Sequence, residues 1–124
     1  MAVRSMRWGL ALLGLLAAAA AGAAPANRVQ MEVNFLLGFV EGSGCEFQRN
    51  GTWHGSVAAQ AHLRDKYRTL VARDLVDSTE QFIERAATQS SLTGQAYLVR
   101  CKGGPTISSK QWLSDELTHM RAQP

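Results

Sequence analysis

The stretch CEFQRNGTWHG, residues 45–55, decides the fold because it predicts a β-hairpin together with its register. Its Asn50-Gly51 step is the preferred dipeptide for a two-residue type I′ turn, in which both central residues need positive φ. A turn of this type sets three cross-strand pairs, which are Arg49–Thr52, Gln48–Trp53 and Phe47–His54. Because side chains alternate along each strand, the first and third pairs then share one face of the sheet with Cys45.

A third strand is expected at residues 96–101, where Tyr97, Val99 and Cys101 alternate onto one face. An isolated hairpin is only marginally stable in water, whereas a third strand gives a sheet that can persist. We therefore expect this strand to pair with the hairpin in a three-stranded antiparallel sheet.

Helical periodicity accounts for most of the remaining chain. Apolar residues recur at helical spacing in residues 27–40, 56–74, 78–91 and the residues after Ser108. Three serines stand where a side chain can cap a helix, and the last two have a glutamine three residues later, as in a capping box: Ser56, Ser78 and Ser108. Residues 102–105 are expected to form a loop. The sequence thus predicts a small α+β domain, residues 27–124, in which about four helices pack with the sheet.

The first 26 residues have the layout of a secretory signal peptide. Arg4 and Arg7 give a basic start, and residues 9–21 form an apolar run that is too short to span a bilayer. The small residues that follow allow cleavage after Ala23 or Ala26. No second apolar stretch of about 18 residues occurs. We therefore expect an exported protein, periplasmic or secreted, with no membrane span in its mature chain.

Removal of this leader changes the charge of the chain. The full sequence carries 13 basic and 10 acidic side chains, a net charge of +3, but Arg4 and Arg7 leave with the leader. The remaining charge is nearly balanced, which gives no electrostatic case for binding nucleic acid. Roughly 98 residues remain, enough for one modest core, and we expect a monomer.

Cys45 and Cys101 are the two cysteines of the chain. In an oxidising compartment such a pair predicts a disulfide, and no Cys-x-x-Cys motif favours a redox role. The closed loop of roughly 57 residues would contribute about 4 kcal/mol in the chain-entropy model. We expect this disulfide to be structural.

Five short runs give the chain a family resemblance: SGCEFQRNG (43–51), AHLRDK (61–66), EQFI (80–83), SSLTG (90–94) and YLV (97–99). In this order and spacing the chain resembles a family of small exported bacterial proteins, a domain of unknown function that includes the YfeK-like proteins. The resemblance covers residues 35–112. It implies an exported bacterial protein and implies no activity.

One set of polar residues could form a site for an anionic group. His62 and Lys66 lie four residues apart and so project from one face of the second expected helix, which can border the hairpin turn. The candidate set combines cationic, imidazole, amide and hydroxyl groups: Arg49, Asn50, His62, Lys66, Ser90 and Ser91. The simpler interpretation is that His62 bonds a buried backbone carbonyl and that the serines only end a helix.

These residues favour a non-catalytic binding or interaction module over an enzyme. The alternative is a small periplasmic hydrolase that uses Ser90 or Ser91 as nucleophile with His62 or Lys66 as base. No Gly-x-Ser-x-Gly or Ser-x-x-Lys motif supports it. A third interpretation is an envelope-stress or folding accessory. The partner would be an unknown envelope component or a protein.

The histidines give no reason to expect a metal. The chain has 3 of them and no His-x-x-x-His pair. We therefore expect neither a metal site nor a cofactor.

Overall fold

The computed structural model describes residues 14 and 26–124 of the 124-residue chain. The expected leader, residues 1–26, lies almost wholly outside the described residues, so the leader and its cleavage points stay predictions. Within the described part, no helix has both the length and the apolar character needed to cross a membrane.

The hairpin of residues 45–55 has the register that its turn predicts. β1 (Glu46–Arg49) pairs antiparallel with β2 (Thr52–Gly55) in the three expected pairs. The turn residues have the positive φ angles of a type I′ turn, 51° at Asn50 and 81° at Gly51. The turn therefore sets which side chains of this hairpin share a face, and the face with the buried Phe47 packs on the helices.

The sheet has four strands in the order β2-β1-β3-β4, so the expectation of three strands is wrong. β3 (Leu98–Arg100) is shorter than the expected strand at residues 96–101 and pairs with β1. β4 (Thr106–Ser108) follows the loop at residues 102–105 and pairs with β3. Its three residues are too few to show an alternating pattern, which is why the sequence does not reveal it.

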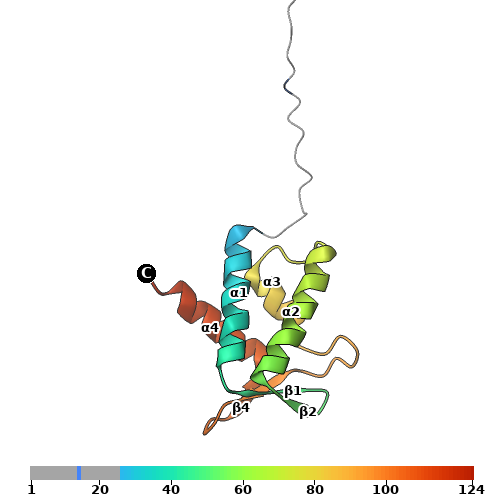
Figure 1. The fold of residues 1–124 in the computed structure, drawn as a ribbon, viewed down its shortest axis with the longest axis vertical. Coiled ribbons are helices and arrows are strands. Elements are labelled where there is room, and N and C mark those ends of the chain that lie inside the picture. The colour runs from blue at the N-terminus through green and yellow to red at the C-terminus, as the bar shows by residue number, and fades with distance from the viewer. Residues whose placement is uncertain (1–13, 15–25) are drawn as a thin grey trace, which may run out of the picture.

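Four helices in the described part lie on one side of this sheet (Figure 1): α1 (Asn27–Gly42), α2 (Ser56–Ala72), α3 (Thr79–Ala86) and α4 (Ser109–Arg121). Ser78 and Ser108 cap α3 and α4 as predicted, since each side chain accepts a hydrogen bond from the backbone N–H three residues later.

Two details of the helices differ from the sequence-based expectation. Ser56 does not cap α2. It is the first residue of the helix, and its hydroxyl donates instead to the carbonyl oxygen of Glu41 at 3.0 Å. α3 ends at Ala86 rather than near residue 91, and just beyond its end the Thr88 hydroxyl donates to the carbonyl oxygen of Ile83.

One apolar core joins the helices to the inner face of the sheet. The sheet contributes Phe47 and Val99, and α1 contributes a completely buried stripe of Val33, Leu36, Leu37 and Val40. The predicted disulfide between Cys45 and Cys101 is present and joins the residue before β1 to the residue after β3. The core and the disulfide together hold β1 and β3 in place under α2.

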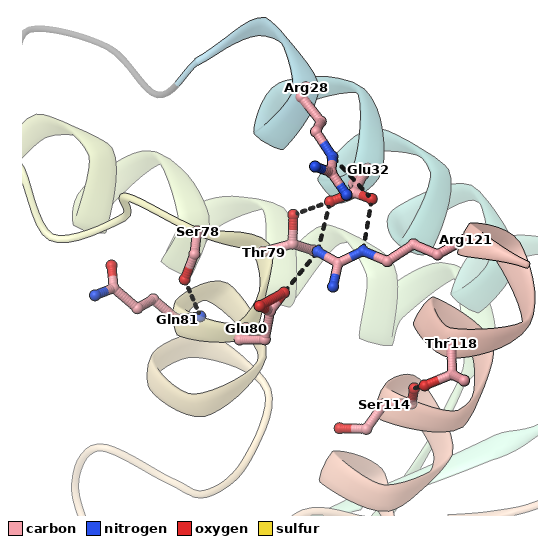
Figure 2. A network of polar contacts seen from close by, with 9 residues as sticks. All are labelled: Arg28, Glu32, Ser78, Thr79, Glu80, Gln81, Ser114, Thr118 and Arg121. Carbon is pink, nitrogen blue, oxygen red and sulfur yellow. Dashed lines mark hydrogen bonds and ion pairs between the residues drawn. The ribbon is translucent and has the colours of Figure 1, made fainter.

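A buried carboxylate ties α1, α3 and α4 together (Figure 2). Glu32 is 8% exposed and accepts hydrogen bonds from the Thr79 hydroxyl at 2.7 Å and from two nitrogens of Arg121, each at 2.9 Å. Arg121 also donates to Glu80 at 2.6 Å. The hydrogen bonds from Arg121 and then from Thr79 lower the pKa of Glu32 from 4.5 to about 2, against the opposing effect of burial. We call this set the Glu32–Arg121 network.

Candidate functional site

Four polar side chains converge where α2 crosses the inner face of the sheet. Arg49 comes from β1, His62 and Lys66 come from α2, and Tyr97 lies just before β3. Arg49 Nη1 is 2.8 Å from His62 Nδ1. The Tyr97 hydroxyl is 3.2 Å from His62 Nε2 and 3.1 Å from Lys66 Nζ. We call these four side chains the cation cluster.

The shortest contact of His62, from Arg49 Nη1 to Nδ1, assigns the tautomer of its neutral imidazole. An arginine only donates, so Nδ1 of His62 accepts from Arg49 and the proton of the neutral imidazole lies on Nε2. Nε2–H then donates to the Tyr97 oxygen, to which Lys66 donates as well. With both lone pairs of that oxygen in use, the O–H proton of Tyr97 has no acceptor among the described residues.

The cation cluster has no acidic partner in the part of the chain that the structure describes. None of the salt bridges there involves Arg49 or Lys66. Burial, followed by the charges of Arg49 and Lys66, lowers the pKa of His62, and the exposed Asp65 opposes this only in part. Burial and then Arg49 lower the pKa of Lys66. Burial raises the pKa of Tyr97, which keeps its hydroxyl protonated.

A pocket of about 60 Å³ opens beside the cation cluster. Arg49, His62 and Tyr97 form its polar wall together with His54. The rest of the lining is mainly apolar, with Phe47, Ala58, Ala59 and Leu63, and also includes Gln48 and Ser109. Among the described residues, only Nη1 of Arg49 is hydrogen-bonded, so the other N–H groups of the guanidinium remain available to a ligand.

The other predicted site residues lie beside the cation cluster rather than in it. The Thr93 hydroxyl donates to Asn50 Oδ1 at 2.6 Å, which joins the turn after residue 90 to the hairpin. Ser90 is 4% exposed, and its hydroxyl oxygen accepts hydrogen bonds from the backbone N–H groups of Leu92 and Thr93. Ser91 is exposed in the same turn.

A serine hydrolase needs its nucleophile within hydrogen-bond reach of a base. In the described structure neither Ser90 nor Ser91 hydrogen-bonds with His62 or Lys66, and the Lys66 ammonium donates to the Gln89 carbonyl oxygen at 3.1 Å. The imidazole of His62 likewise contacts side chains rather than a backbone carbonyl. Across residues 26–124 no group of three or more histidine, cysteine or acidic side chains could hold a metal ion.

Tyr97 is the candidate residue that the sequence pattern did not identify. The strand pattern places it in the core with Val99, and it is indeed only 6% exposed. A buried tyrosine hydroxyl usually has a hydrogen-bond partner. That rule, applied to a tyrosine at the start of a buried strand, is the signal that could have pointed to a polar site there.

Comparison with known proteins gives a family and no activity. The model of a family of unknown function, DUF5329, matches residues 27–121. A stretch of 51 residues is 43% identical to the uncharacterized protein YfeK of Salmonella typhimurium and covers 41% of each chain. The chain thus spans less than half the length of that relative. No solved structure matches the chain.

Proposed function

The chain belongs to the DUF5329 family of unknown function, and from the geometry of its site we propose that it is an exported, periplasmic binding module that holds an anionic group. The observation that carries this proposal is the convergence of Arg49, His62 and Lys66 on Tyr97 without an acidic partner among the described residues. An anion at this point supplies the missing negative charge.

Two kinds of free donor support the proposal. The guanidinium of Arg49 keeps N–H groups that no described residue uses, and charge-assisted hydrogen bonds from arginine to an oxyanion are about twice as strong as neutral ones. The O–H of Tyr97 is free as well, because its oxygen already accepts two hydrogen bonds. Lys66 does not line the pocket. Its ammonium donates to the Tyr97 hydroxyl and lies over the Tyr97 ring, where it adds positive charge to the site.

Burial is the largest cause of the lowered pKa values of His62 and Lys66, and the positive charge of neighbouring side chains lowers both further. A bound anion offsets that charge. The pKa of His62 should therefore rise toward its ordinary value of 6.5 when the site is filled.

The test is a titration of the isotope-labelled protein with sodium acetate and with inorganic phosphate in low-salt buffer, followed by NMR. We expect saturable shifts at the amides of β1 and α2 and a rise in the pKa of His62. Arg49→Met should weaken binding at least tenfold, since about 1.4 kcal/mol of lost hydrogen bonding is enough for that factor.

The matched control is Arg68→Met, which removes a positive charge from the exposed surface of α2. It should leave both affinities unchanged. Absence of saturable binding by either anion, or equal losses in Arg49→Met and Arg68→Met, would disprove the proposed site.

A further inference from the structure

We infer that the anion held by the cation cluster is a carboxylate that carries a small aliphatic group. This inference rests on the proposed function and adds the chemical class of the ligand. It comes from the pocket beside the cluster, which has a polar wall that suits a carboxylate and an apolar wall that suits hydrocarbon.

The polar wall can satisfy the two oxygens of a carboxylate. A planar guanidinium offers a fork of N–H donors that matches the two oxygens in one plane. Arg49 lines the pocket, and only its Nη1 hydrogen-bonds a described residue. Tyr97 and His54 also line the pocket, and their polar groups can complete the contacts of the head group.

Apart from Gln48 and Ser109, the rest of the lining is apolar and offers no side-chain donor to the further oxygens of a phosphate or sulfate. Phe47 and Leu63 are 7% and 4% exposed and close this side of the pocket, with Ala58 and Ala59 beside them. An oxygen turned toward these carbons would lose its hydrogen bonds to water without replacement. A methyl or methylene group there gains instead, because apolar cavities favour apolar groups over water.

The size of the pocket limits the aliphatic group. Its volume of about 60 Å³ is several times the space that one buried water needs, which is roughly 10–15 Å³ on this measure. The space therefore admits a short aliphatic group and not a long chain. Two sources fit this chemistry: a free short-chain acid, and the carboxyl end of a peptide whose last side chain is small and apolar.

The experiment is an affinity series measured by NMR titration with formate, acetate, propionate and isobutyrate. Propionamide serves as the uncharged control and inorganic phosphate as the oxygen-rich anion. We expect each carbon from formate to propionate to tighten binding about fourfold, the factor for burying one CH₂ group, and propionamide not to bind. Ala58→Leu, a change at an exposed position on the pocket rim, should flatten the series and leave formate unaffected.

The outcomes separate this inference from the proposed function. Equal affinities along the series, phosphate binding tighter than propionate, or an unchanged series in Ala58→Leu would overturn the carboxylate inference and leave an anion site standing. Failure of every anion to bind would overturn both. N-acetylalanine binding tighter than propionate would identify a peptide end, and weaker binding would identify a free acid; either result supports the ligand class.

Discussion

The Glu32–Arg121 network and the cation cluster are both groups of charged side chains that join elements distant in the sequence. In the network, the carboxylates of Glu32 and Glu80 face Arg121 at 2.6–2.9 Å. In the cation cluster, neither Arg49 nor Lys66 forms a salt bridge with a carboxylate of the described residues. The same kinds of side chain are thus balanced in one region and unbalanced in the other.

The pKa values show what this difference does. In the network, hydrogen bonds from Arg121 and Thr79 lower the pKa of Glu32, so folding favours its charged form. In the cluster, burial and neighbouring positive charge lower the pKa of His62 and Lys66, so folding disfavours their charged forms. The first arrangement stabilises the fold, whereas the second weakens it in the way that binding sites commonly do.

The largest expected effect comes from the disulfide, which holds the strands under the cation cluster and does not touch the Glu32–Arg121 network. Replacing Cys45 and Cys101 with alanine should lower the free energy of unfolding by about 4 kcal/mol. At roughly 4–8 °C per kcal/mol for a domain of this size, calorimetry should show a large drop in melting temperature. A melting temperature within a few degrees of the oxidised protein would contradict this prediction.

The second largest expected effect is a loss of stability in acid, caused by protonation of Glu32 in the network. The pKa of Glu32 is about 2 in the folded state against 4.5 unfolded, so the unfolded chain binds more protons between these values. The stabilisation, roughly 3 kcal/mol, is complete above the unfolded pKa and is lost as pH falls from 4.5 toward 2. Urea unfolding across this range measures it. Glu32→Gln should remove most of the slope, and a slope that persists in the variant would assign it to other carboxylates.

Arg121→Met should cost about 2–3 kcal/mol, because it leaves the buried Glu32 with Thr79 as its remaining partner. The value is below that of a fully buried pair, since the Arg121 side chain is 35% exposed. The matched control is Arg28→Met, which removes a side chain that is 74% exposed and 3.8 Å from the same carboxylate. It should cost less than about 1 kcal/mol. Equal losses in the two variants, measured by urea unfolding, would contradict the assignment of the network to Arg121.

Lys66→Met gives the smallest expected effect and the sharpest contrast. Removing the Lys66 ammonium lowers the repulsion between positive charges in the cation cluster. The Tyr97 oxygen keeps its hydrogen bond with His62. We expect the stability to be unchanged or higher, within about 1 kcal/mol, and close to that of Arg68→Met on the exposed face of α2. Thermal unfolding of the two variants tests this. A large loss confined to Lys66→Met would make Lys66 structural and remove the difference between the two regions.

The parts of the fold that short-range chemistry determines could be predicted from the sequence. The Asn50-Gly51 turn sets the hairpin register, because its φ angles are a local property. The caps at Ser78 and Ser108 follow from residues three positions apart. β4 could not be predicted in the same way, because three residues carry no pattern and their order comes from pairing with β3.

In the candidate site, too, short-range spacing could be predicted and long-range contacts could not. His62 and Lys66 share a helix face, which their spacing predicts. Tyr97 meets them across 35 and 31 residues, and a strand pattern gives a buried tyrosine no polar role. Ser90 is near Tyr97 in the sequence, but its hydroxyl oxygen accepts hydrogen bonds from the backbone of its own turn and does not join the cluster. Local spacing thus identified the helix side of the cluster, and long-range packing decided the rest.

The contact between Glu32 and Arg121 also constrains the order in which the molecule can be completed. The two residues are 89 positions apart, so a chain made from its N-terminus carries Glu32 for most of synthesis before its partner exists. During that time α1 has its apolar face ready and no counter-ion from α4 for its carboxylate. Thr79 of α3 can meet Glu32 earlier, whereas the two hydrogen bonds from α4 can form only when the last residues of the chain are present.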